Sequence, residues 1–256
     1  MASRIVRWVA FSCVHAPLQH EPSIKRLLKE IANHRPHVVV CLGDLLDASP
    51  ASRFPTEDQW GLLEEYEQAG RILERVREAA SGDAERFVWL HGNHDQNILE
   101  PCRLPKRLRS LCDWHASDNR LSRELQAGGW KEVGYSHRQV WRLGQVAFQH
   151  GAEHGVNAGR NLAQLYAPEF GLLVWGHTHR PTPASEAFLV SKVSLNRWHA
   201  NAGCLVDWNR LAYVQRMNTS LWGHACVVGE ALSGGRRIRF GARNWDAETV
   251  VFDRCG

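Results

Sequence analysis

Short apolar runs alternate along the chain with longer polar segments. The most distinct runs occupy residues 5–11, 38–42, 87–90, 146–148 and 172–175, and several more follow residue 200. They are rich in Val, Leu, Phe and Trp and are bounded by Gly, Asp, Asn and His, a pattern typical of buried strands. Because helical segments separate many of these strands, the chain is predicted to form a layered α/β protein.

Helical periodicity marks the polar segments. Apolar side chains recur on one face of residues 22–34, which predicts a helix that ends before Pro36. A longer helix is predicted over 56–80, because its first residues, TEDQ, have the form of a capping box. Shorter helices are predicted over 119–127 and 158–166.

The C-terminal part of the chain is predicted to form strands in WGHACVVGE, RRIRFGARNW and ETVVF, with turn residues between the first two. Strands of this kind pack on a main sheet more readily than they form a domain of their own. We therefore expect a single domain over residues 1–256, with a motif-bearing core over 4–205, C-terminal strands over 206–256 and a substrate-shaping insertion over 96–142.

Side chains with metal-ligand chemistry follow five of the apolar runs directly, in the stretches FSCVHAP, GDLLD, HGNHD, QHG and GHTH. In an α/β sheet the carboxyl ends of parallel strands lie along one edge, where ligands bind. Residues far apart in sequence are therefore expected to meet there. The candidate ligands are Cys13, His15, Asp44, Asn93, His150, His177 and His179. Each stretch alone is a weak signal, because a single HxH pair is more often structural than a ligand pair.

The ordered set CxH, GDxxD, GNHD, H and GHxH resembles the calcineurin-like metallophosphoesterase superfamily, whose first motif is DxH. The resemblance covers residues 4–205, and every motif except the first is intact. It implies a four-layer α/β/β/α sandwich that holds two divalent or mixed-valence metal ions. It also implies hydrolysis of phosphate esters by attack of a hydroxide that bridges the two metals.

The resemblance further implies a role for each motif residue. The first ion would be bound by His15, Asp44 and His179, and Asp44 would be shared with the second ion. His94 would be the acid near the leaving group, and Asp95 would orient it. The remaining ligands of the second ion would be Asn93, His150 and His177.

Cys13 stands where the family has its first aspartate. A thiolate is a softer ligand than a carboxylate, so zinc or iron is favoured at that site and manganese less so. Across the whole centre, zinc, iron or manganese is expected. In a second interpretation the thiol stays outside the coordination shell and the first ion is labile. A third interpretation is reversible oxidation of Cys13.

Four further polar residues near the motifs have other interpretations. Asp47 is expected to support a ligand, because Asp44 already supplies the shared carboxylate. His91 is expected to be structural, and His154 lies outside the family pattern and has no assigned role. Asn201, in the stretch NAG, would suit a supporting hydrogen bond to a ligand.

Composition restricts the class of protein. The chain of 256 residues is 44% hydrophobic and 23% charged, which is typical of a globular protein. Its seven cysteines include no CxxC pair, so a disulfide framework is not expected and a reducing compartment fits best. No apolar window is long enough to span a membrane, and the N-terminus has no cleavage site typical of a signal peptide. A cytoplasmic location without membrane partners is expected.

The substrate class is less constrained. A basic loop gathers Arg103, Lys106, Arg107 and Arg109, which would either steer phosphate or form a solvated surface. We expect a phosphomonoesterase acting on a phosphorylated small molecule, a nucleotide or a phosphoprotein. A phosphodiesterase or nuclease is the alternative, although the net charge of +4 lacks the strength expected for long nucleic acid. A non-catalytic metal-binding interaction module is a third hypothesis, and the sequence does not indicate an oligomeric state.

Overall fold

The structure is a computed structural model of the 256-residue chain. It describes residues 4–51, 60–99, 120–136, 140–169, 171–181, 188–189, 197–211, 213–214, 217–232, 238–246 and 250–254.

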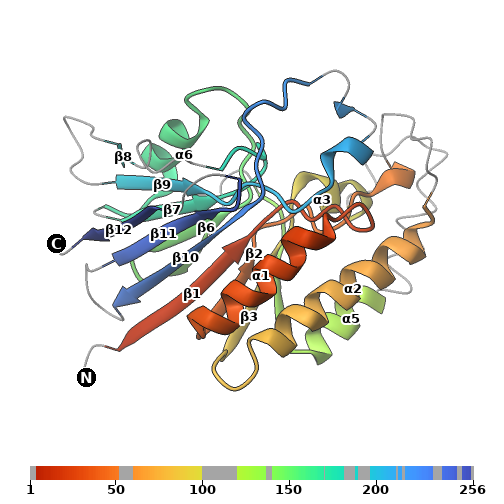
Figure 1. Ribbon diagram of the computed structural model, residues 1–256, viewed down its shortest axis with the longest axis horizontal. Helices are drawn as coiled ribbons and strands as arrows, with labels where there is room; N and C mark the ends of the chain where they lie inside the picture. Colours follow the sequence, from red (N-terminus) through yellow and green to blue (C-terminus); the bar gives the residue numbers. More distant parts are fainter. Residues whose placement is uncertain are drawn as a thin grey trace.

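The larger of two sheets has seven strands in the order β12-β11-β10-β1-β2-β3-β4 (Figure 1). Strands β1 to β4 are parallel to one another, whereas β10, β11 and β12 add to the β1 edge as antiparallel neighbours. The strands are β1 (Ile5–Phe11), β2 (Val38–Cys41), β3 (Arg86–Leu90), β4 (Trp130–Val133), β10 (Ala225–Leu232), β11 (Ile238–Asn244) and β12 (Val250–Arg254).

The smaller sheet has five strands in the order β5-β6-β7-β9-β8. Strands β6, β7 and β9 are parallel, and β5 and β8 form its antiparallel edges. The strands are β5 (Trp141–Leu143), β6 (Val146–Gln149), β7 (Leu172–Trp175), β8 (Phe188–Leu189) and β9 (Arg197–Asn201).

Helices cover the outer face of each sheet. The outer face of the larger sheet packs on α1 (Glu21–His34), α2 (Leu62–Ala79) and α5 (Arg120–Ala127), and α6 (Ala158–Tyr166) packs on the smaller sheet (Figure 1). A third buried cluster, which includes Trp8, lies between the two sheets. The predicted four-layer α/β/β/α sandwich is therefore confirmed.

Three short helical segments connect these layers. Helix α3 (Asn93–Leu99) follows β3 directly, and 3₁₀ turns occupy Ser49–Ala51 and Trp208–Arg210. No helix in the part of the chain that the structure describes is long and apolar enough to cross a membrane.

Most predicted elements are confirmed, including the C-terminal strands, which join the main sheet where Val9 pairs with Val228. The predicted helix over 56–80 begins later, at Leu62. Its N-cap residue Gly61 is extended, with φ −73° and ψ 146°, so the helix does not continue toward the capping-box sequence. That sequence itself lies outside the described residues.

The expected substrate-shaping insertion over 96–142 is largely regular where it is described. Helix α5 packs against α2, and β4 extends the large sheet beyond β3. The described part therefore enlarges the scaffold, and a substrate-shaping role for the insertion remains a prediction. The basic residues Arg103, Lys106, Arg107 and Arg109 lie outside the described residues. The single-domain boundaries remain a prediction.

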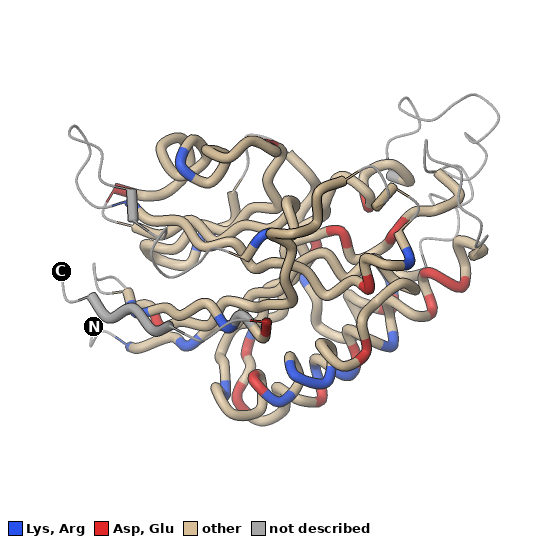
Figure 2. Tube along the Cα trace, turned by 45° about the horizontal axis from the view of Figure 1, so that its top comes forward, with Lys and Arg blue, Asp and Glu red and all other residues tan. Residues whose placement is uncertain are grey.

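Charged residues of both signs are interspersed on the outer helices. Both α1 and α2 carry Lys or Arg together with Glu, so neither helix has charges of one sign only (Figure 2). This pattern is typical of solvated helix faces.

Candidate metal centre

Backbone conformations that non-glycine residues rarely adopt are concentrated at the strand ends. Seven described non-glycine residues have positive φ, and five of them are candidate ligands. These are Cys13 (53°), His15 (50°), Asp44 (49°), His177 (70°) and His179 (59°). Each such conformation costs on the order of 1–3 kcal/mol and persists only where the surroundings impose it. Their clustering points to a functional site.

Two glycines allow the turns after β2 and β3 to approach each other. Gly43 has φ 102°, and a Cβ added to it would lie 2.5 Å from the backbone nitrogen of Gly92 and 2.8 Å from His150 Nδ1. A Cβ added to Gly92 would overlap Asp44. These residues must therefore lack side chains for Asp44 and His150 to meet.

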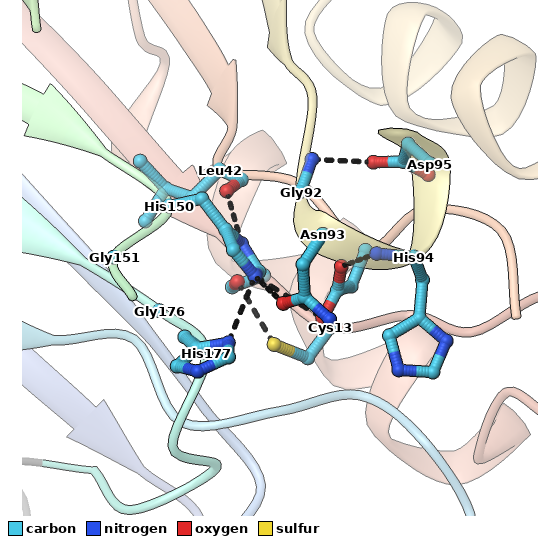
Figure 3. A network of polar contacts seen from close by, with 12 residues as sticks. Cys13, Leu42, Gly92, Asn93, His94, Asp95, His150, Gly151, Gly176 and His177 are labelled. Atoms are coloured by element: carbon cyan, nitrogen blue, oxygen red, sulfur yellow. Dashed lines mark hydrogen bonds and ion pairs between the residues drawn. The ribbon is translucent and has the colours of Figure 1, made fainter. Parts of the chain in front are cut away.

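Asp44 lies between two groups of donor atoms. Its Oδ2 is 3.1 Å from His150 Nε2 and 3.8 Å from His15 Nε2. His150 Nε2 is also 3.1 Å from the side-chain oxygen of Asn93 and 3.3 Å from His177 Nδ1 (Figure 3). One side of Asp44 therefore faces the candidate ligands that follow β3, β6 and β7, namely Asn93, His150 and His177.

The other group contains the donors that follow β1. His15 Nε2 is 3.3 Å from His179 Nε2. The ligand atoms of Cys13, His15 and His179 lie within 4.8 Å of one another, as do those of Cys13, Asp44 and His150. All seven candidate ligands are thus brought to the carboxyl ends of their strands, although their ligand roles remain predictions.

The chemistry of this donor set fits a cation. His150 Nδ1 lies 2.8 Å from the Leu42 carbonyl oxygen, so it donates its hydrogen there. Burial lowers the pKa of this ring, but Asp44 raises it by more, so the ring keeps a proton on Nε2, toward the oxygens of Asp44 and Asn93, to a higher pH than an ordinary histidine. A metal ion that displaced this proton would be bound by Nε2 together with the oxygens of Asp44 and Asn93.

The same arrangement recurs at His15. Its Nδ1 is 3.0 Å from Asp47 Oδ1, so the hydrogen is on Nδ1 and the lone pair of Nε2 faces His179. A carboxylate that fixes a ring tautomer in this way is a common companion of a metal-binding histidine. Asp47 therefore lies where a supporting residue was expected.

Burial and mutual charge set the protonation of the site. Burial raises the pKa of Asp44, but His150, His94 and His15 outweigh it and hold that pKa well below its usual range. Burial and the neighbouring His150 lower the pKa of His177 to about 3, and burial with His15 lowers that of His179 strongly. A carboxylate and two neutral imidazoles, which are the forms that bind metals, are therefore favoured.

Cys13 is fully buried, and its sulfur lies 3.1 Å from the Ser12 hydroxyl. Burial, assisted by the charge of Asp44, raises the pKa of its thiol well above the ordinary value. A metal bound by this sulfur would have to displace the thiol proton. The geometry places Cys13 beside both donor groups, and its role as a ligand remains a prediction.

His94 lies in the first turn of α3. Its backbone N–H donates to Asp44 Oδ1 at 2.9 Å, and its ring Nδ1 donates to the Asp47 carbonyl oxygen at 2.7 Å. Burial lowers the pKa of the His94 ring, but Asp44 and Asp47 raise it by more, so the net shift is upward. The ring therefore retains a proton to a higher pH than an ordinary histidine.

Asp95 has a different position from the one expected for an orienting partner of the His94 ring. Its carboxylate accepts backbone N–H groups of Gly92 (2.7 Å), Leu46 (2.9 Å) and Leu45 (3.4 Å). Asp95 therefore ties α3 to the turn after β2, and Figure 3 shows its contact with Gly92. The Asp47 carbonyl orients the His94 ring instead.

Two residues outside the motif ligands also have defined contacts. His91 packs on Trp89 and lies 3.6 Å from Glu132, in agreement with a structural role. Asn201 donates to the Gly176 carbonyl at 2.8 Å, so it supports the turn that carries His177. The supporting hydrogen bond expected from Asn201 to a ligand remains a prediction.

Sequence reasoning left two supporting contacts unassigned. His154 Nε2 lies 3.1 Å from His177 Nε2. Glu65, buried on α2, accepts the backbone N–H groups of Ala48 (2.7 Å) and Ser49 (2.9 Å) and thereby holds the turn after Asp47. A charged residue within the apolar stripe of a predicted helix was the available signal for Glu65.

Comparisons with known proteins agree with this fold. The model of the calcineurin-like phosphoesterase family matches residues 6–181. The chain belongs to this family. No curated protein matched the sequence.

Solved structures of vacuolar protein sorting 29 share the fold. The protein from Cryptosporidium parvum is 12% identical, with a TM-score of 0.51, over 98% of this chain and 99% of that one. A single mutant of Vps29 from Entamoeba histolytica is 13% identical, with a TM-score of 0.48, over 96% and 99%. The similarity to the Cryptosporidium parvum structure supports a shared fold, whereas 12% identity carries no information on activity.

Proposed function

We propose that the protein is a metal-dependent phosphomonoesterase. The observation that carries the proposal is the convergence of the side-chain oxygens of Asp44 and Asn93 on His150 Nε2, where a metal ion would take the place of the ring proton. The residues that would hold two ions are Cys13, His15, Asp44, Asn93, His150, His177 and His179. When bound, such ions polarise a phosphoryl oxygen and activate water.

His94 is proposed as the acid that protonates the leaving oxygen. Because its Nδ1 donates to the Asp47 carbonyl, Nε2 is the ring atom left to donate to a substrate. The side chain is 20% exposed, so solvent and substrate have access to it. Asp44 and Asp47 outweigh the effect of burial on the pKa of His94, so the ring keeps its proton to a higher pH than an ordinary histidine.

A phosphodiesterase or nuclease is the second candidate, because its chemistry uses the same donor set. The interspersed charges on the described outer helices provide no track for a long nucleic acid (Figure 2). This favours a small ester.

Four described cysteines, Cys13, Cys41, Cys204 and Cys226, are free, which supports our proposal of a cytoplasmic location.

A non-catalytic binding module remains the competing class, because the solved relatives are named for vacuolar protein sorting and the fold alone does not define an activity. The position of His94 favours the enzyme. Its ring is oriented by one hydrogen bond and partly exposed beside Asp44, an arrangement that metal binding alone does not require.

The test is removal and restoration of the metal. Purified protein would be analysed for its elements, treated with chelator and assayed with p-nitrophenyl phosphate and bis-p-nitrophenyl phosphate after addition of zinc, manganese, iron or nickel. We expect chelation to abolish hydrolysis, metal to restore it and the monoester to react faster. Faster reaction of the diester would favour the second candidate. Bound metal without hydrolysis of either ester would favour the binding module.

A further inference from the structure

Three partly buried aromatic residues, Trp208, Tyr213 and Trp222, lie beside the candidate metal centre. We refer to these three residues as the aromatic rim. The Trp222 ring meets the His179 ring edge-on, with centroids 4.4 Å apart and an interplanar angle of 76°. The Tyr213 ring centroid is 6.4 Å from that of His94. The rim therefore adjoins both a candidate ligand and the candidate acid.

One side of the aromatic rim is fixed by the protein. The rim packs on a buried cluster that contains Cys13 and Cys204. Trp208 also stacks on His224, with centroids 4.2 Å apart. The rings are therefore held in place while part of each remains exposed, which is the condition for a preformed contact with a planar ligand.

The position of the rim indicates which part of a substrate would reach it. If His94 protonates the leaving oxygen, the alcohol part of the ester departs on the side of His94 and hence near Tyr213. Aromatic side chains there would stabilise an alcohol that carries a planar ring, through stacking or edge-to-face contact. An aliphatic alcohol would gain less from the same surface.

The extent of the rim distinguishes two kinds of planar ring. The Trp208 and Trp222 centroids are 6.4 Å apart, so the aromatic surface continues beyond the ring that contacts His179. In an aryl phosphate the ring is attached directly to the ester oxygen. In a nucleotide the base is separated from the phosphate by a sugar, and a surface that extends from the centre suits the nucleotide better.

We propose that the aromatic rim binds the base of a nucleoside monophosphate. This inference rests on the proposed phosphomonoesterase function and specifies its substrate class. Trp222 is the specificity-determining residue, because it joins the rim to His179.

The test compares adenosine 5′-monophosphate with ribose 5-phosphate, which has the phosphate and the sugar but lacks the base. We expect kcat/KM of the metal-loaded protein to be about tenfold higher for the nucleotide, the scale on which base stacking contributes. Trp222→Ala should remove most of this ratio, whereas Trp222→Phe should keep much of it. Leu221→Ala is the matched control, because Leu221 is 62% exposed on the same loop, and it should leave the ratio unchanged.

A binding measurement separates this inference from the proposed function. Adenosine, which has no phosphate to hydrolyse, should bind the metal-free wild-type protein and Leu221→Ala in an NMR titration, and should bind Trp222→Ala much more weakly. If neither ester is hydrolysed but this pattern is observed, the phosphomonoesterase function fails and the base contact stands.

Other outcomes overturn the base contact. Equal kcat/KM for the nucleotide and ribose 5-phosphate would do so while leaving the phosphomonoesterase function intact. The same conclusion would follow if Trp222→Ala kept the wild-type ratio. A preference for phenyl phosphate over the nucleotide that disappears in Trp222→Ala would replace the nucleoside with a directly attached aryl group.

Discussion

His94 is the residue at which catalysis and metal retention can be separated. Its ring has hydrogen bonding and charge suited to proton donation, and no metal-ligand role is proposed for it. His94→Ala should therefore keep the metal content and lower kcat by about 10²- to 10⁴-fold, the usual contribution of general acid catalysis. Elemental analysis together with steady-state kinetics provides the measurement.

The leaving group supplies the decisive comparison for His94. A nitrophenolate leaves without much help from an acid, so His94→Ala should lose less activity on nitrophenyl phosphate than on an alkyl phosphate. His91→Ala is a matched control, because that side chain contacts Glu132 and Trp89 instead. Equal losses on both esters would exclude the acid role.

Spectroscopy can show whether the sulfur of Cys13 binds a metal ion. If its sulfur binds the first ion, the cobalt-substituted protein should have an intense near-ultraviolet charge-transfer band that nitrogen and oxygen ligands do not produce. Cys13→Ser should erase the band, Cys13→Asp should keep the site and shift its preference toward manganese, and Cys204→Ser should leave the band unchanged. An occupied first site without the band in the wild-type protein would make Cys13 a bystander.

At the scale of single residues, the motifs predicted which side chains meet but not all of their partners. The expectation that ligands bind at the carboxyl ends of the strands was sufficient to predict that Asp44, Asn93 and His150 lie close together. The partner of the His94 ring was not predictable, because it is a backbone carbonyl, that of Asp47, and its position depends on a turn. Every residue has a backbone carbonyl, so the amino-acid sequence does not indicate which carbonyl will accept a given hydrogen bond.

At the scale of secondary-structure elements, helix α2 contributes to the site through one buried carboxyl group, that of Glu65. Burial, with a smaller effect from Asp47, raises the pKa of Glu65 from 4.5 to about 8. Between these values the folded protein binds more protons than the unfolded chain. The Glu65 contribution to the free energy of unfolding should therefore be full below pH 4.5 and should decrease as pH rises to about 8.

The measurement is the free energy of unfolding of the metal-free protein against pH, for the wild type and Glu65→Gln. The variant lacks the titrating group, so the wild-type stability relative to the variant should decrease across this window. Glu67→Gln, on the exposed side of the same helix, is the control and should follow the wild type. Parallel curves for the wild type and Glu65→Gln would contradict the raised pKa.

The predicted boundaries of helices match the structure where the local sequence signals agree with one another. Helix α6 has the predicted range, because its apolar face is continuous. Helix α2 starts later than its capping-box sequence suggested, because Gly61 adopts an extended conformation immediately before Leu62. A capping signal is local, and the backbone around it can still place the helix start elsewhere.

At the scale of the whole molecule, the site exists because two sheets face each other and contribute different donors. Asp44 and Asn93 come from the larger sheet, whereas His150 and His177 come from the smaller one. The order of motifs predicted this layered fold through a family resemblance. The aromatic rim was not predicted, because Trp208, Tyr213 and Trp222 follow the motifs and only the tertiary structure brings them to the site.

The shared carboxylate gives the most direct test of the metal-dependent account. Metal content and phosphatase activity would be measured on the same preparations of the wild type, Asp44→Asn and the charge-matched surface control Asp83→Asn, with circular dichroism to verify folding. We predict two ions per wild-type chain, and in Asp44→Asn the loss of most of the metal and the activity together, while Asp83→Asn retains both. A folded Asp44→Asn protein with unchanged metal content and full activity would contradict the account.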